Sequence, residues 1–439
     1  MVSVPTAEDP GAPQRAPARR ALVAGSVGNF IEWHEFGAYG CFATVFAANF
    51  FGAGSGDGTE SLIKTYASFA LAFFFRPVGA ALFGRIGDRF GRRPALVLAL
   101  VLMTGSTTAI GLLPTYATLG AAAPWALTLV RVLQGLSAGG EFGGAVSLMT
   151  ESAPQGRRGL YGAWQSFTVA LGLLAGAGLA VGAAAVLGER ALYDWGWRVP
   201  FLLALPLGLV ALWLRWKLEE TPSFRRTRST GAGPPGSPAT RGEVFRSILT
   251  GIGRIMGWSA AGYTFLVVLP AYLQNTLGAT FQEALTAAVL ANLGFALTIL
   301  PAGALSDRVG RRPVMVAGAG LVVLLAFPLL WTVRSGSTPT VAKGLVVLLA
   351  GAVVGLMAGP GPAMLAEMFP TRVRCTGLGL AYSLANAVFS GCAGLIITEL
   401  VHRTANADIP AYYTVVTCAI SAAALLTLRG DDHRRALRD

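Results

Sequence analysis

An apolar stretch near the start of the chain contains two carboxylates and an imidazole, Glu32, His34 and Glu35. A charged side chain in such surroundings is costly unless a partner neutralises it, so these residues are candidates for function. A carboxylate removed from water holds its proton more tightly and a nearby cation opposes this, so a buried acid beside an arginine can exchange protons. The alternative is a set of static ion pairs that hold helices together.

Other apolar stretches carry the opposite charges. A guanidinium forms two parallel hydrogen bonds with a carboxylate, so a buried arginine suits either a glutamate or the carboxylate of a bound solute. The acids and cations that we expect to face one another are Glu32, Glu35 and Glu141, and Arg76, Arg131 and Arg254. For Arg76, a purely structural pair is the alternative.

The spacing of these residues predicts that they share helix faces, because positions i, i+3, i+7 and i+10 lie on one stripe of an α-helix. We expect two such stripes to face a common cavity. They are Asn29, Glu32, Phe36 and Tyr39, and Arg131, Gln134, Ala138 and Glu141. Gly135, Gly139 and Gly143 occupy another face and predict close approach of a neighbouring helix.

These patterns give two sets of candidate residues. The proton-coupling candidates are Glu32, Glu35, His34 and Glu141. The substrate-binding candidates are Arg131, Gln134, Arg76, Asn29, Phe36, Tyr39, Trp164, Tyr382 and Asn386. An imidazole can titrate near physiological pH, although a lone membrane histidine is often only a packing residue.

Several polar and aromatic residues could contact a solute or only pack between helices. Trp33, Phe36 or Trp164 would suit a quaternary ammonium through cation–π contact. In the second half of the chain the polar residues for which both interpretations stay open are Tyr263, Tyr272, Asn292, Tyr382 and Asn386.

The composition indicates which elements position these residues. Of 439 residues, 54% are hydrophobic and only 13% are charged, whereas soluble domains have about 25% charged residues. Apolar runs long enough to cross a bilayer core of about 30 Å recur along the chain, and backbone amides in hydrocarbon require helices. We predict an all-α membrane protein with twelve transmembrane helices, at 21–52, 62–88, 94–114, 122–151, 158–188, 196–217, 247–276, 282–306, 312–333, 340–367, 374–401 and 409–429.

The net charge of +12 is a topology signal and does not indicate binding of nucleic acid. Most of the 34 Lys and Arg residues lie on one side if the N-terminus is cytoplasmic, as the positive-inside rule expects. We therefore expect a multi-pass protein of the plasma (inner) membrane with both termini cytoplasmic. The four cysteines stand apart and only three histidines exist, so we expect no metal and no cofactor.

A loop motif occurs twice. GRIGDRFGRRP at 84–94 returns as GALSDRVGRRP at 303–313, and Glu151 and Glu367 follow the two copies at similar distances. Each copy belongs to a group of six predicted spans, which indicates an internal repeat. The predicted organisation is an N-terminal tail 1–20, a bundle 21–217, a linker 218–246, a second bundle 247–429 and a C-terminal tail 430–439.

The repeated loops place an aspartate ahead of an arginine cluster at the predicted cytoplasmic ends of helices 2 and 8. Ion pairs there can form in one access state and break in the other, and the alternative is that the arginines only anchor the topology. The gating candidates are Asp88, Arg89, Arg92, Arg93, Glu151, Asp307, Arg308, Arg311, Arg312 and Glu367.

The duplicated GxxxDRxGRR loop resembles the signature of the major facilitator superfamily. Other stretches resemble the metabolite:proton symporter family, which includes proline/betaine transporters and α-ketoglutarate permeases; they include GNFIEWHEFGAYG at 28–40, RVLQGLSAGGEFGGA at 131–145 and AEMFPTRVRCTGLGLAYSLANAVF at 366–389. The resemblance implies the major facilitator fold. The family usually has an aromatic residue followed by Asp where this chain has His34 and Glu35.

These observations favour a secondary active transporter that works by alternating access. The first hypothesis is proton symport that imports an osmolyte such as proline or betaine, or an organic acid such as α-ketoglutarate. The alternatives are proton-driven efflux of a small molecule and a receptor built on a transporter scaffold. An enzyme is not expected, because no nucleophile–base pair or phosphate-binding loop is visible. The expected partners are a small-molecule substrate, protons and the lipid bilayer, with the protein acting as a monomer.

Overall fold

The computed structural model describes residues 15–52, 58–216 and 240–429. The expected tail 430–439, most of the tail 1–20 and most of the linker 218–246 lie outside these residues. Within the described ranges the regular structure is helical and contains no strand. The prediction of an all-α protein is therefore confirmed.

Each of the first six predicted spans is helical in the structure. They are α1 (Arg15–Cys41) with α2 (Ala43–Phe46) and η1 (Ala47–Phe51); α3 (Gly58–Phe90); α4 (Arg92–Leu112); α6 (Ala122–Glu151), preceded by α5 (Tyr116–Leu119); α7 (Arg158–Asp194); and η2 (Gly196–Arg198), α8 (Val199–Leu202) and α9 (Ala204–Trp216). The first helix begins at Arg15, so residues 15–20 extend it instead of belonging to the tail.

The second six spans are helical as well. They are α11 (Arg241–Tyr263), η3 (Thr264–Val268) and α12 (Leu269–Leu277); α13 (Phe281–Val309); α14 (Arg311–Arg334); α15 (Thr340–Ala358) with α16 (Gly361–Met368); η4 (Thr371–Val373), α17 (Arg374–Asn386), η5 (Ala387–Gly391) and α18 (Ala393–Thr404); and α19 (Ile409–Leu425). The run GPGP at 359–362 separates α15 from α16, as expected for prolines in a helix.

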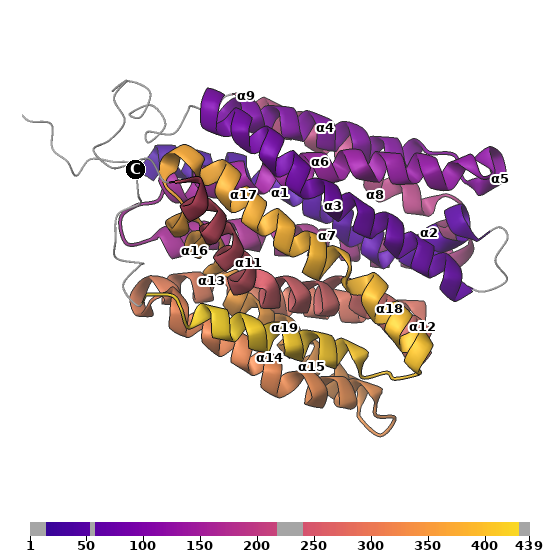
Figure 1. The fold of residues 1–439 in the computed structure, drawn as a ribbon. Helices are drawn as coiled ribbons and strands as arrows, with labels where there is room; N and C mark the ends of the chain where they lie inside the picture. The colour runs from indigo at the N-terminus through magenta and orange to yellow at the C-terminus, as the bar shows by residue number, and fades with distance from the viewer. Residues whose placement is uncertain (1–14, 53–57, 217–239, 430–439) are drawn as a thin grey trace, which may run out of the picture.

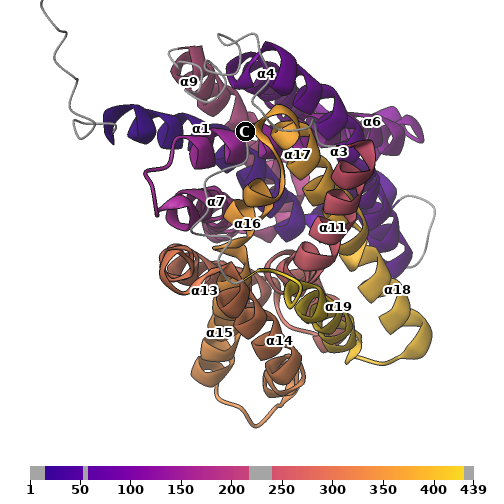
Figure 2. The ribbon, with the colours of Figure 1, turned by 60° about the vertical axis from the view of Figure 1, so that its left-hand side comes forward.

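The two halves lie side by side as two bundles. In Figure 1 the first half occupies mostly the upper part of the molecule and the second half the lower part, and Figure 2 shows the same division after a turn of 60°. Contacts across the junction come chiefly from α17 packed on α3 and from α13 packed on α7. These four helices therefore form most of the interface at which a solute site would lie.

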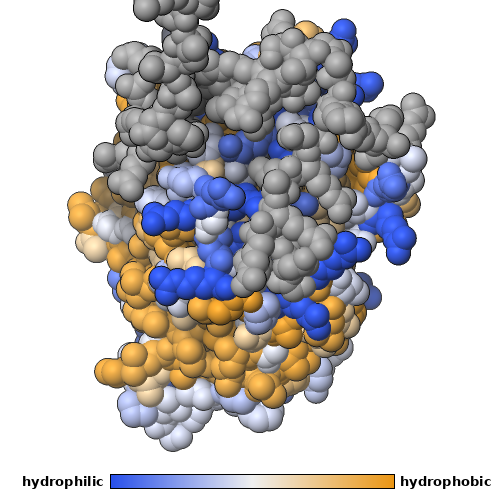
Figure 3. Space-filling model, turned by 90° about the vertical axis from the view of Figure 1, so that its left-hand side faces the viewer, coloured by the Kyte–Doolittle hydropathy of each residue, from blue (hydrophilic) through white to orange (hydrophobic). Residues whose placement is uncertain are grey.

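The helices are suited to a membrane. Among the described residues, nine helices are long and apolar enough to cross a bilayer, and Ile409–Leu425 is apolar but shorter. One end of the bundle carries both repeated loops, and we name it the loop face. Figure 3, which looks onto this end, shows hydrophilic side chains gathered there and hydrophobic side chains around them.

Glycines bring the central helices together in the same way in both halves. A Cβ atom on Gly135 or Gly139 of α6 would collide with backbone carbonyls of α3, those of Ala72 and Arg76. In the second half, a Cβ atom on Gly351 of α15 would collide with α13 in the same manner. Gly135 and Gly139 of the predicted glycine face therefore pack on the helix that carries Arg76, whereas Gly143 lies against Cys375 of α17.

Candidate functional site

Arg131 joins three helices through a closed network of hydrogen bonds. Its Nη1 donates to Oε1 of Glu35 on α1 at 2.6 Å and to Oε1 of Gln134 at 2.9 Å. Thr107 of α4 accepts a hydrogen bond from Gln134 at 2.9 Å and donates one to Glu35 at 3.4 Å. The guanidinium lies 3.4 Å from the ring centroid of Tyr39. All these side chains are buried, so the carboxylate and the cation compensate each other in an interior where an unpaired charge would be costly.

Arg76 forms the second buried pair, beside a group of aromatic rings. Its Nη2 lies 3.2 Å from Oε1 of Glu32. The guanidinium is 4.1 Å from the centroid of Phe73, 4.5 Å from that of Phe36 and 5.6 Å from that of Trp33, so aromatic faces stabilise its charge. Among the described residues, no hydrogen-bond partner is present for Nε of Arg76. A cation with a remaining donor is able to receive a further anionic group.

Glu141 forms a third buried pair, with Arg215 of α9. Both carboxylate oxygens of Glu141 accept hydrogen bonds from the guanidinium of Arg215. Nη1 of Arg215 also donates to the carbonyl oxygen of Leu96 at 2.5 Å. Helix α1 passes over this pair at Gly28, where a Cβ atom would lie 2.7 Å from Oε1 of Glu141. A bidentate pair of this kind is rigid and well compensated.

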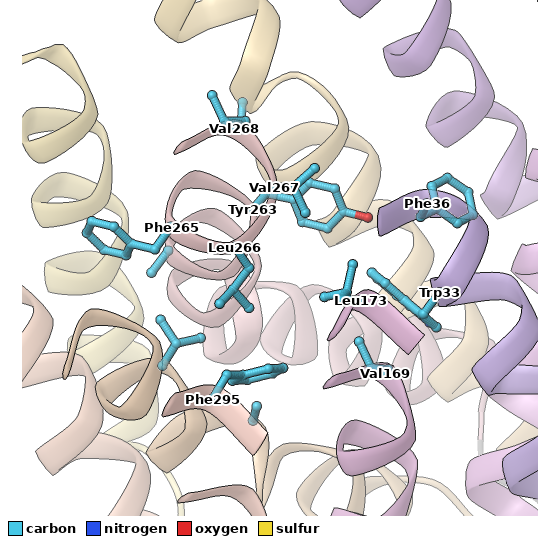
Figure 4. Close-up of a cluster of buried hydrophobic side chains, with 14 of the residues drawn as sticks. Trp33, Phe36, Val169, Leu173, Tyr263, Phe265, Leu266, Val267, Val268 and Phe295 are labelled. Carbon is cyan, nitrogen blue, oxygen red and sulfur yellow. The ribbon is translucent and has the colours of Figure 1, made fainter. Parts of the chain in front are cut away.

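A small cavity of about 30 Å³ lies at the junction of the halves. Figure 4 shows Trp33, Val169 and Leu173 of the first half facing Tyr263, Leu266 and Phe295 of the second. The lining consists of Trp33, Ser166, Val169, Leu173, Trp258, Ser259, Gly262, Tyr263, Leu266, Val267, Phe295, Tyr382 and Asn386. No charged side chain is among these residues, and aromatic rings dominate the wall.

The two repeated aspartates close the loop face in a reciprocal manner. Asp88 of the first half accepts hydrogen bonds from the backbone amides of Cys375 and Thr376, at 3.3 and 3.1 Å, in the first turn of α17. Asp307 of the second half accepts from the amides of Gly159 and Leu160, at 2.7 and 2.9 Å, in the first turn of α7. Each carboxylate thus meets free amides at the positive end of a helix in the other half.

Arginines and glutamates extend this closure. In the first cluster, Glu151 pairs with Arg92 at 3.2 Å and with Arg374 of the other half at 2.9 Å. In the second, Glu367 pairs with Arg311 at 3.0 Å and with Arg158 of the other half at 3.5 Å. Arg92 and Arg311 also pair with the preceding aspartates, Asp88 at 3.2 Å and Asp307 at 2.8 Å. The paired motifs found in the sequence therefore form two equivalent links between the halves.

Known proteins resemble the chain along nearly its whole length. The family model described as "Sugar (and other) transporter" matches residues 21–231, and the one described as "Major Facilitator Superfamily" matches residues 247–438. The proline/betaine transporter of Escherichia coli (strain K12) is 33% identical over 95% of this chain and 84% of its own length. The chain belongs to the major facilitator superfamily. It is therefore a multi-pass membrane transporter and not an enzyme.

Other relatives within the superfamily agree. The α-ketoglutarate permease of Escherichia coli (strain K12) is 38% identical over 87% of each chain. The solved structure of the proton:xylose symporter XylE superposes with a TM-score of 0.77, at 19% identity, over 94% of this chain and 95% of that one. At that identity the superposition speaks for the twelve-helix major facilitator fold alone, and it confirms the predicted fold class.

Three candidates from the sequence lie away from the cavity and the buried pairs. Asn29 donates to Thr168 at 2.6 Å and to the carbonyl oxygen of Gln165 on α7, so it packs within the first half and does not line the cavity. Trp164 stacks edge-on with Phe167 and is outside the cavity lining. Arg254 donates to Thr427 at 3.0 Å and does not join the buried glutamates. Its partner Thr427 lies just past the end of α19, at the loop face.

The other candidates from the sequence lie next to the buried ion pairs or on the loop face. His34 is buried against Phe30, and neither of its ring nitrogens has a hydrogen-bond partner among the described residues. Phe36 and Tyr39 stack against Arg76 and Arg131 and do not line the cavity. The outer arginines of the two loops are exposed; they are Arg89, Arg93, Arg308 and Arg312.

Three arginines of the site are not among the candidates from the sequence. Arg215 is buried and pairs with Glu141, and Arg158 and Arg374 each complete one of the links between the halves. For Arg158 and Arg374 the sequence contains a signal, because each stands seven residues after the repeated glutamate of its half, Glu151 or Glu367.

Replacing Asp88 with asparagine is expected to slow maximal uptake about tenfold while substrate affinity changes by less than about threefold. Asparagine is neutral and cannot serve two amides, Thr376 Oγ1 and Arg92 at once, and losing such bonds costs about 1–3 kcal/mol. Initial uptake rates and equilibrium binding in proteoliposomes measure the two effects.

Asp307→Asn provides the matched variant, since it breaks the equivalent link. Asp408→Asn, which breaks a pair with Arg334 elsewhere, serves as the control. Normal maximal uptake by Asp88→Asn at normal expression would count against a gating role and favour simple topology anchoring.

Proposed function

We propose that this transporter is a proton symporter that imports a small zwitterionic osmolyte of the proline or betaine type through the plasma (inner) membrane. The loop face and both termini are cytoplasmic in this proposal, because the Arg-rich loops gather there. The observation that carries the proposal is the aromatic cavity at the junction of the halves, placed beside a buried carboxylate–arginine pair.

The cavity wall favours a solute that carries an alkylated nitrogen. Trp33, Trp258, Tyr263 and Tyr382 line the cavity, and the face of an aromatic ring attracts a quaternary or secondary ammonium through cation–π contact. A dicarboxylate such as α-ketoglutarate would need cations in the wall, and the described lining contains none. Relatives of both kinds resemble the chain, since two proline/betaine transporters are 33% and 34% identical to it and the α-ketoglutarate permease is 38% identical, so the choice of substrate class rests on the cavity wall.

Arg76 is the cation nearest to this wall, because its guanidinium lies over Trp33, one of the lining residues. The carboxylate of a zwitterion seated in the cavity would reach Arg76 by displacing Glu32. The released glutamate would then be a buried carboxylate without its cation, and it would take up a proton. Binding of the solute and uptake of the proton are linked by this exchange of partners.

Alternating access follows from the two bundles. The links between Asp88 and α17 and between Asp307 and α7 close the loop face, so a solute arriving at the cavity would come from the opposite side. The halves would then rock about the cavity until these links open. The cavity of about 30 Å³ is smaller than such a solute, so the halves must separate further to admit it.

A panel of solutes tested on the purified protein checks the substrate class. Glycine betaine and proline are expected to raise the melting temperature by a few degrees at millimolar concentration, and α-ketoglutarate is expected to leave it unchanged. Trp33→Leu should weaken betaine binding about tenfold, because it removes one face of the wall. Trp331→Leu, on an exposed face of α14, is the matched control.

The direction of transport needs a separate measurement. Radiolabelled betaine should accumulate inside right-side-out vesicles when the outside is acidified. Export from preloaded vesicles under the same gradient, without uptake, would overturn import in favour of efflux. Stabilisation by α-ketoglutarate alone would overturn the zwitterionic substrate.

A further inference from the structure

Four carboxylate–arginine pairs follow one another through the first half toward the loop face. Helix α1 runs away from that face, so Glu35, Glu32 and Gly28 lie successively nearer to it, about one turn apart. The pair of Glu141 and Arg215 lies against Gly28. The ordered pairs are Glu35–Arg131, Glu32–Arg76, Glu141–Arg215 and Glu151–Arg92.

The pair Glu141–Arg215 lies between Glu32, the carboxylate that the solute would release, and the ion pairs that close the loop face. Glu32 is within electrostatic range of both Glu141 and Arg215. On the other side, Glu141 and Glu151 are on the same helix, ten residues or about 15 Å apart. A proton released by Glu32 toward the loop face therefore meets Glu141 first.

Among the charged groups near Glu141, Arg215 is the one that contacts its carboxylate. Arg215 of α9 pairs with Glu141 and also donates to the carbonyl oxygen of Leu96 on α4. The charged groups that α1 and α3 place nearby, Glu32 and Arg76, pair with each other. The charged groups that α4 and α17 place near this helix, Arg92 and Arg374, pair with Glu151 at the loop face. Tyr382 of α17 stacks on the neighbouring Phe142.

We propose that Arg215 is a positioning residue that holds Glu141 ionised, ready to receive the proton from Glu32 and to pass it to water at the loop face. This inference rests on the proposed proton symport. The O–H bond of Glu32 breaks and a new one forms on Glu141, while the freed Glu32 carboxylate pairs with Arg76 again. Arg215 keeps its hydrogen bond to Leu96 during this step. When the loop face opens, Glu141 gives the proton to water and pairs with Arg215 again.

The test uses reconstituted vesicles and two assays on each variant, namely betaine exchange, which needs no net proton movement, and accumulation driven by a pH gradient. Glu141→Gln is expected to keep exchange and to lose accumulation by about tenfold or more. Arg215→Gln removes the cation that favours the ionised form, so the dependence of coupled transport on loop-side pH should move to higher pH. Arg215→Lys should move this pH profile less.

The double variant Glu141→Gln/Arg215→Gln removes both charges and leaves no buried ion unpaired, so it tests the proposal even if a single variant misfolds. It is expected to exchange betaine without accumulating it. Asp408→Asn breaks an ion pair of the second half and should leave both assays and the pH profile unchanged.

Normal accumulation by folded Glu141→Gln or by the double variant would overturn the inference. So would an Arg215→Gln protein whose exchange and accumulation fall together with an unchanged pH profile, since that result indicates a structural pair. Failure of the proposed function gives a different result, because the wild-type protein would then move no protons with betaine.

Discussion

Uptake is expected to fall at least a hundredfold when Arg131 is replaced with alanine. The change leaves the carboxylate of Glu35 buried without its cation and removes the donor to Oε1 of Gln134. Breaking one partner of a buried pair of this kind costs about 3–5 kcal/mol. The cost falls on the junction of α1, α4 and α6, about one turn of α1 from Glu32, whose pair with Arg76 links binding to proton uptake in the proposed mechanism.

Arg131→Lys separates charge from geometry. Lysine keeps the positive charge, but it lacks the planar group that reaches Glu35 and Gln134 together while lying over Tyr39. Binding should weaken by about tenfold with the fold intact. Betaine affinity and initial uptake in proteoliposomes at two pH values measure both variants. Arg131→Ala with wild-type affinity and unchanged pH dependence would remove Arg131 from the mechanism.

The second large effect concerns the two carboxylates of α1. Glu35→Gln and Glu32→Gln should each abolish accumulation driven by a pH gradient, whereas betaine exchange should persist. Glutamine has the shape of glutamate and can still accept a hydrogen bond from Arg131 or Arg76, but it cannot carry a proton between states. The expected phenotype is a folded, uncoupled transporter.

Exchange and accumulation measured in the same vesicle preparation reveal this phenotype. Glu60→Gln, which removes an exposed partner of Lys64, is the matched control and should behave as wild type. Equal loss of exchange and accumulation in Glu32→Gln and Glu35→Gln would show that these residues hold helices together and do not couple protons.

The fold was predictable because the features that define it recur along the sequence. Long apolar runs leave the backbone no alternative to helices, and the duplicated loops around Asp88 and Asp307 mark the two halves. The sequence also predicted that Glu32, Glu35, Arg76 and Arg131 form ion pairs with one another, because an unpaired charge inside the membrane is costly. The structure pairs Glu35 with Arg131 and Glu32 with Arg76.

The candidates that were placed wrongly depend on how the helices pack, which the periodicity of one helix does not define. A helical stripe fixes which residues share a face but not which neighbour that face meets, so Asn29 turned toward α7. Position along the chain also does not define depth in the bundle. Arg254 lies beside Thr427, just past the end of α19, whereas Arg215, two residues from the end of predicted span six, is buried by α1 and α4.

Glu32, Glu35 and Glu141, the carboxylates that carry the proton in the proposed mechanism, are buried residues of the first half. The second half contributes much of the cavity wall, including Trp258, Tyr263 and Tyr382. The two halves, although built on the same repeat, therefore carry different parts of the proposed mechanism. We expect substitutions in the second half to change substrate specificity while proton coupling in the first half is kept. Chimaeras that exchange the second half between relatives would test this separation.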